Sequence, residues 1–161
     1  MKIRIFTTGG TFDKEYDPIS QRLVVKPTRV PKLLERGWCQ VDFVVTSLMS
    51  MDSLDMTDAD RRVILENCKN AIEDHILITH GTDTMNKTAA LLASEIKNKT
   101  IVFTGALVPY EFKNSDSSFN LGAALAFVQT LPHGVYIAMN GKCYAWDKVK
   151  KNTQTGFFES I

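Results

Sequence analysis

The chain has 161 residues, of which 44% are hydrophobic and 23% are charged, and its formal net charge is +1. This composition is typical of a folded globular protein and excludes a disordered one, and we expect a single domain over residues 1–161. The balanced charge argues against nucleic acid or an anionic membrane as a partner.

The first predicted element is a strand at residues 3–7, followed by the turn Thr8-Gly9-Gly10-Thr11. Its two glycines allow backbone conformations closed to other residues, so the turn can present amides to a ligand. It lacks the dinucleotide fingerprint and the Lys-Ser/Thr ending of a phosphate-binding loop. A ligand-binding turn and a purely structural one both remain open.

The next segment, residues 12–26, is polar and contains Pro18, which predicts a loop or small hairpin. A segment of this length often covers a cleft, so Tyr16 is either a lid residue or plain surface. A helix is expected at 28–36. The nearly apolar run 41–46 predicts a central strand buried on both faces.

Polar residues follow this strand in the segment 49–57, before a helix predicted to reach about residue 72. Thr57 and Asp60 have the spacing of a capping box at the start of that helix. Asp52, Ser53 and Asp55 are left without such a structural task, so they are candidate site residues.

A third strand, at 75–79, ends in His80-Gly81-Thr82-Asp83, and a helix is predicted at 85–95. Polar side chains at the carboxyl end of a buried strand lie where open α/β sheets bind ligands, so Thr82 and Asp83 are site candidates. The alternative is that one of them caps the helix. His80 is interpreted as a satisfied structural residue rather than an acid or base.

Further strands are expected at 100–104, 134–139 and 143–146, with a helix at 117–130. Asp116 is a candidate cap for that helix, and a structural or interface role is expected for it. Alternating strands and helices predict an α/β fold, a doubly wound, mostly parallel, flavodoxin-like sheet with helices on both faces.

The three cysteines are widely spaced and match neither a metal site nor a redox motif. We therefore expect free thiols, a cytoplasmic location and no metal. The first residues lack the apolar core of a signal peptide, and no apolar run is long enough to span a membrane.

Three strand-end loops thus provide Thr11, Ser53, Thr82 and Asp83, and the segment 147–153 provides lysines. A threonine hydroxyl becomes a nucleophile when a base removes its proton, and a lysine with a depressed pKa can be that base. This combination favours acyl transfer on an amide without a cofactor.

Two of these motifs, Thr8-Gly9-Gly10-Thr11 and the segment from His80 to Met85, resemble the two signatures of the bacterial-type L-asparaginases and glutaminase-asparaginases. The similarity extends to residues 52–56, 104–116 and 147–153, in the family's order. It implies the fold of the asparaginase N-terminal domain and hydrolysis of asparagine, or a related amide such as glutamine.

By this resemblance Thr11 is the primary nucleophile, and Thr82, Asp83 and Lys150 form a second catalytic cluster. Ser53 and Asp83 then hold the α-carboxylate and α-ammonium groups of the substrate. Charge supports this assignment, because a carboxylate pairs with an ammonium and a hydroxyl donates to a carboxylate.

The resemblance also makes Tyr16 the tyrosine that orients the nucleophile. Leu54 departs from the polar residue that some members have there. We expect no counterpart of the family's second, carboxy-terminal domain after the lysine segment, so a weakly active or non-catalytic amino-acid-binding module is the alternative function.

Assembly is the last expectation, because family members bury much of this domain against other subunits. An apolar helix face and tail predict a homo-oligomer, unless these side chains fill the domain's own core. The residues concerned are Phe119, Leu121, Phe127, Phe157 and Phe158.

Overall fold

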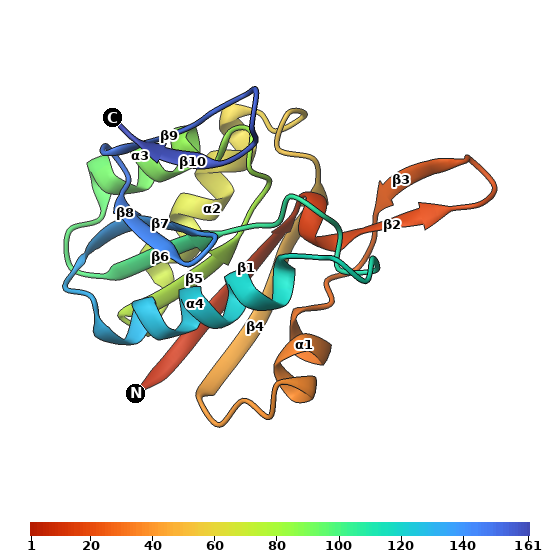
Figure 1. Ribbon diagram of the computed structural model, residues 1–161. Coiled ribbons are helices and arrows are strands. Elements are labelled where there is room, and N and C mark those ends of the chain that lie inside the picture. Colours follow the sequence, from red (N-terminus) through yellow and green to blue (C-terminus); the bar gives the residue numbers. More distant parts are fainter.

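A computed structural model describes residues 1–161 as a six-stranded sheet between two layers of helices (Figure 1). The strand order is β4-β1-β5-β6-β7-β8; all neighbouring pairs are parallel except β7 and β8. The predicted α/β class with a mostly parallel sheet is confirmed. The strands are β1 (Lys2–Gly9), β4 (Asp42–Met51), β5 (His75–Thr79), β6 (Thr100–Thr104), β7 (Gly134–Met139) and β8 (Lys142–Ala145).

Four helices cover the sheet, two on each face, as a doubly wound fold requires. They are α1 (Val30–Arg36), α2 (Asp58–Asn70), α3 (Met85–Glu95) and α4 (Ser117–Thr130). Side chains of α2 and α3 share one apolar cluster with the sheet, and those of α1 and α4 share the other. Each strand of the sheet centre therefore buries both of its faces.

The capping box predicted at the start of α2 is present. The Thr57 hydroxyl accepts a hydrogen bond from the Asp60 amide, and the Asp60 carboxylate accepts one from the Thr57 amide at 2.8 Å. Two backbone donors that the helix itself leaves unpaired are thereby satisfied, which fixes the point where the loop after β4 becomes helix.

Strand β4 is not central, and this expectation is wrong. It lies at the edge of the sheet and pairs only with β1. Its apolar side chains pack partly against both clusters, so both faces are covered while one backbone edge stays open. The pattern of apolar residues predicts which faces of a strand are buried. It does not predict which strands are its neighbours, so it does not give the strand's position in the sheet.

Two short antiparallel ribbons lie outside the main sheet. The segment after the first turn forms the hairpin of β2 (Lys14–Asp17) and β3 (Arg22–Val25), which projects from the domain (Figure 1). Near the C-terminus, β9 (Val149–Lys151) pairs with β10 (Phe158–Ser160). Val149 and Phe158 are buried in the α2/α3 cluster, so this second ribbon is anchored on that face.

No helix combines the length and the apolar character needed to cross a membrane. All three cysteines are free thiols, as their spacing predicts.

Candidate active site

Three loops meet beyond the carboxyl ends of β4, β1 and β5, which are adjacent strands. The turn after β1 touches the turn after β5, because a Cβ added to Gly10 would lie 2.6 Å from the Cα of Gly81. A Cβ added to Gly81 would lie 2.5 Å from Ser53 Oγ. Only glycines permit this approach, so these two residues bring the segments of Thr11, Ser53 and Thr82 together.

A lysine, a threonine and a carboxylate form the most polar contact of this region. Lys151 Nζ donates to Thr82 Oγ1 at 2.8 Å and to Asp83 Oδ1 at 2.7 Å. Thr82 is buried, whereas 46% of the Asp83 side chain is exposed. The Thr82 oxygen accepts from the ammonium, so its hydrogen is free to point elsewhere.

The lysine that contacts Thr82 and Asp83 in the structure is Lys151, whereas the expectation named Lys150; a catalytic role for either lysine stays a prediction. Successive side chains of a strand point to opposite sides. In β9 the Val149 side chain is buried, Lys150 is exposed, and Lys151 returns to the side of Thr82. The side-chain amide of Asn86 on α3 donates to the Val149 carbonyl at 2.8 Å, which fixes the strand at this register.

Ser53 lies at the centre of the junction with only 1% of its surface exposed, and its hydroxyl has no hydrogen-bond partner. Its carbonyl accepts from the Thr84 hydroxyl at 2.8 Å, which ties the loop after β4 to the turn before α3. An unpartnered buried hydroxyl is costly, so this donor is available to a ligand.

A buried arginine, absent from the residues selected by motif, supports this connection. Arg61 Nη2 donates to Thr84 Oγ1 at 3.0 Å, and Nη1 donates to the Met56 carbonyl at 2.8 Å. The signal that could have identified it is its position on the buried stripe of α2, together with Ile64, Leu65 and Cys68. A charged residue in such a stripe normally has buried partners.

An ion pair fastens the hairpin to the Ser53 loop, and sequence reasoning missed this pair too. Lys14 Nζ lies 2.5 Å from Asp52 Oδ2. Burial alone would raise the pKa of the Asp52 carboxyl, but the hydrogen bond from Lys14 and the charges of Lys14 and Lys151 hold it below its ordinary value. Asp52 is therefore ionised and adds negative charge beside the cluster.

Thr11 begins the short 3-10 turn Thr11–Asp13 directly after Gly10, whose φ of 75° is in the left-handed region. Two residues later, Asp13 is buried and accepts hydrogen bonds from Thr28 Oγ1 and the Arg29 amide. Burial outweighs these bonds and raises the pKa of Asp13 to about 6.

Tyr16 lies on β2 with 52% of its surface exposed, and its hydroxyl makes no hydrogen bond within the chain. The backbone amide of Tyr16 donates to Glu111 Oε2 at 2.9 Å. The hairpin interpretation of this segment is confirmed, while the proposed orienting role of Tyr16 stays a prediction.

His80 has a structural role, as expected. It is completely buried; Nδ1 lies 2.8 Å from the Gly81 carbonyl and Nε2 lies 2.8 Å from Thr88 Oγ1. A carbonyl can only accept, so Nδ1 carries the proton and Nε2 accepts from the Thr88 hydroxyl. Burial lowers the pKa of His80 to about 4, which keeps the ring neutral.

Helix capping does not account for Thr82, Asp83 or Asp116. The residue that precedes α3 is Thr84, and its hydroxyl makes no capping bond to the helix; it donates to the Ser53 carbonyl instead. Asp116 precedes α4 without a capping bond from its side chain; its carboxylate accepts from the amides of Leu107 and Val108 at 3.0 Å. Its expected structural role is confirmed, and its expected capping role is wrong.

The junction therefore combines hydroxyls, a carboxylate and an ammonium at the carboxyl edge of the sheet. Nowhere in the chain do three or more His, Cys, Asp or Glu side chains form a group that could hold a metal ion. A nucleophilic hydroxyl, a proton-accepting amine and a carboxylate that orients it are the components of covalent acyl transfer.

Comparison with known proteins gives a consistent result. The model of the family "Asparaginase, N-terminal" matches residues 2–160. L-asparaginase 1 of Escherichia coli is 31% identical over 96% of this chain and 48% of its own length. The structure of the thermostable L-asparaginase from Thermococcus kodakarensis superposes with a TM-score of 0.86 at 27% identity and covers 100% of this chain and 51% of that one.

A further relative carries a different name. It is one of the subunits of the glutamyl-tRNA(Gln) amidotransferase of Thermoplasma volcanium, and it is 31% identical over 86% of this chain and 35% of its own length. The chain thus spans about half the length, or less, of these relatives. By its sequence and its fold, the chain belongs to the asparaginase family, within the region of that family's N-terminal domain.

Proposed function

We propose that this site hydrolyses the side-chain amide of L-asparagine, or a related ω-amide, to a carboxylate and ammonia. The observation that carries the proposal is the position of Lys151 Nζ, 2.8 Å from Thr82 Oγ1 and 2.7 Å from Asp83 Oδ1. A potential base, a hydroxyl and a carboxylate are thus in contact with one another. The close approach of Gly10 to Gly81 brings the turn that contains Thr11 next to them.

The substrate is oriented by its α-amino and α-carboxylate groups. Asp83 uses Oδ1 for Lys151, which leaves Oδ2 and an exposed face for the α-ammonium. The unpartnered hydroxyl of Ser53 donates to the α-carboxylate. These are charge-assisted hydrogen bonds, which are about twice as strong as neutral ones.

The reaction begins when the Thr11 hydroxyl attacks the amide carbon and loses its proton. The tetrahedral oxyanion is stabilised by backbone amides of the surrounding turns, each worth on the order of 3 kcal/mol if aligned. The carbon–nitrogen bond then breaks, the nitrogen takes up a proton and leaves as ammonia, and an ester to Thr11 remains. Water attacks this ester and releases the carboxylate product.

Lys151 takes part in these proton transfers through Thr82. In the resting arrangement the ammonium donates to Thr82 Oγ1. Once deprotonated, the amine accepts the Thr82 hydrogen instead, so Thr82 Oγ1 can receive a proton from a water or from the reacting hydroxyl. Asp83 holds the lysine in place through both charge states.

A second candidate is a module that binds a small amino acid with little or no turnover. The half-exposed Asp83 carboxylate favours it, because a site open to water loses electrostatic stabilisation of the transition state. Binding needs only Ser53 and Asp83, whereas turnover also needs Thr11, Thr82 and Lys151.

We also propose a cytoplasmic homo-oligomer. Leu121 and Phe158 are buried in the domain's own core, but Phe119 and Phe157 are 63% and 52% exposed. Exposed phenylalanines are suited to an interface between copies. Light scattering at micromolar concentration tests this, and a monomer there would contradict it.

The deciding experiment measures ammonia released from asparagine and from glutamine, with calorimetry of aspartate binding in parallel. Ammonia release supports the amidohydrolase, and the preferred amide identifies the substrate. Saturable aspartate binding without ammonia supports the binding module. Neither binding nor turnover would contradict both candidates.

A further inference from the structure

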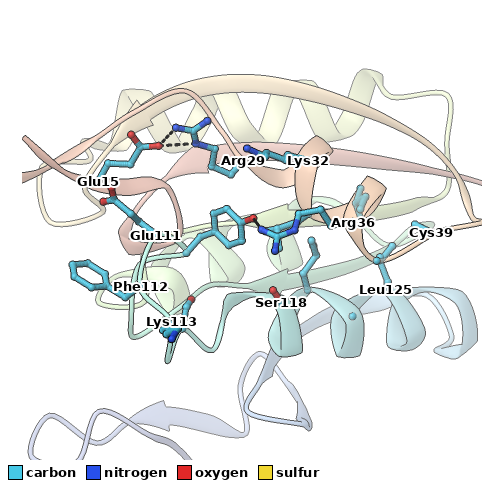
Figure 2. A pocket seen from close by; sticks show the side chains of 17 residues that line it. Glu15, Arg29, Lys32, Arg36, Cys39, Glu111, Phe112, Lys113, Ser118 and Leu125 are labelled. Carbon is cyan, nitrogen blue, oxygen red and sulfur yellow. Dashed lines mark hydrogen bonds and ion pairs between the residues drawn. The ribbon is translucent and has the colours of Figure 1, made fainter.

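A cavity of about 870 Å³ is lined by residues outside the Lys151 cluster. Its walls come from α1, from α4 and from the loop that contains Tyr110 and Lys113 (Figure 2). These helices cover the sheet face opposite to the one on which β9 is anchored, and none of the residues proposed for amide hydrolysis lines the cavity. A volume of this size is suited to an organic molecule rather than to a single ion.

Positive side chains predominate around the opening. Four cations line it, from Arg29, Lys32, Arg36 and Lys113, against the carboxylates of Glu15 and Glu111. The Glu15 carboxylate pairs with Arg29, and Glu111 accepts from a backbone amide. Lys32, Arg36 and Lys113 have no ion pair, and four cations against two carboxylates leave an excess of two positive charges at the cavity.

One of these cations is held in place. Arg36 Nη1 donates to the Tyr110 hydroxyl, and the guanidinium carbon lies 6.0 Å from the centroid of the Tyr110 ring. Figure 2 shows the Lys32 and Arg36 side chains from α1 on one side of the space and the Ser118 hydroxyl of α4 on the other. A guanidinium with a fixed orientation and an unpaired ammonium on the same helix form a suitable receptor for a phosphate group.

The apolar part of the lining comes from α1 and α4, and it borders an exposed glycine that the fold itself does not require. Leu33, Leu34, Leu121 and Leu125 are all buried and line the cavity. Between the last two, Gly122 lies inside helix α4, where a glycine costs about 1 kcal/mol relative to alanine. A Cβ added there would meet no atom within 4 Å, so the space above the helix backbone is empty. A flat group can lie against this bare stretch of helix.

We propose that this cavity binds an organic phosphate monoester with a planar aromatic part, of the size of a nucleoside monophosphate. The phosphate contacts Lys32 and Arg36 at the opening, and the ring lies between the leucines and the backbone at Gly122. The proposal concerns residues other than those proposed for amide hydrolysis and does not depend on that reaction.

Calorimetry with AMP, GMP, CMP and UMP tests the proposal on the whole chain. At least one should bind saturably, more tightly than inorganic phosphate and than adenosine. Equal affinity for inorganic phosphate would overturn the role of the aromatic part, and equal affinity for adenosine would overturn the role of the cations. No saturable binding of any of the four nucleotides would overturn the whole proposal.

Two variants identify the site. Gly122→Leu fills the empty space without a clash and should weaken binding at least tenfold, while Ala126→Leu, on an exposed position of the same helix outside the cavity, should not. Lys32→Gln should lower the affinity for the nucleotide and make that affinity less dependent on salt concentration. Lys142→Gln on β8 should change neither. A dissociation constant unchanged by Gly122→Leu would contradict the proposal.

Light scattering tests for a protein occupant. The wild type and Gly122→Leu should have the same mass. If the wild type were a dimer and Gly122→Leu a monomer, the cavity would be an interface between copies, and the nucleotide proposal would be wrong.

Discussion

Two buried ionisable groups should give the stability of this protein opposing responses to acid. Asp13 has its pKa raised from 3.8 to about 6 by burial, and His80 has its pKa lowered from 6.5 to about 4 by burial. Each difference corresponds to ~3 kcal/mol between the protonation states. The two groups titrate over nearly the same pH range.

The signs follow from which form the fold prefers. The folded protein binds the Asp13 proton more tightly than the unfolded chain does, so this stabilisation is fully present below pH 3.8 and is lost as the pH rises through about 6. The folded protein disfavours the His80 proton, so stability is lost as the pH falls from 6.5 to about 4. Between about pH 4 and 6.5 the two contributions largely cancel.

The test is urea denaturation of the wild type, Asp13→Asn and His80→Gln at pH 4.5 and 7.5. The asparagine amide would keep an oxygen for the Thr28 and Arg29 donors, so the Asp13→Asn variant should fold. On lowering the pH from 7.5 to 4.5, its free energy of unfolding should drop by about 2 kcal/mol more than that of the wild type. His80→Gln should change in the opposite direction. Parallel pH dependence in all three proteins would mean that burial does not shift the pKa of Asp13 and His80.

Three further substitutions test the loops around the site. Arg61→Met removes the donors to the Met56 carbonyl and the Thr84 hydroxyl. In steady-state kinetics KM for asparagine should therefore rise more than kcat falls, and an unchanged KM would count against a positioning role of Arg61. Gly81→Ala places a Cβ 2.5 Å from Ser53 Oγ and should lower both stability and activity, whereas the control Gly122→Ala should be neutral or stabilising by up to ~1 kcal/mol in thermal unfolding. Thr57→Ala should cost about 1 kcal/mol in urea denaturation, and no loss would mean that the capping box is energetically silent.

Much of the fold could be predicted because local signals and tertiary structure agree. The expected bounds of β5, α3, β6, α4 and β7 match the structure. The strands among them are short runs of mostly apolar residues that bury both faces, and the helices begin and end at clear changes of pattern. The convergence of three loops also follows from the rule that parallel strands end at one edge of the sheet.

The features that could not be predicted depend on partners far away in the sequence. The edge position of β4 is set by pairing with β1 alone. The register that selects Lys151 over Lys150 is set by the burial of Val149 and by the Asn86 hydrogen bond. The composition of this basic segment suggests solvent-exposed surface. The β9–β10 ribbon instead brings Lys151 into contact with Thr82 and Asp83.

The central claim is that Lys151, Thr82 and Asp83 act as one unit in amide hydrolysis. Ammonia release from asparagine should be compared for the wild type, Lys151→Met, Thr82→Val, their double variant and Lys150→Met. We expect that Lys151→Met and Thr82→Val each abolish most of the activity, that the double variant is little worse than either, and that Lys150→Met is nearly unaffected. Full activity in Lys151→Met, or loss of activity in Lys150→Met, would contradict a catalytic role for Lys151.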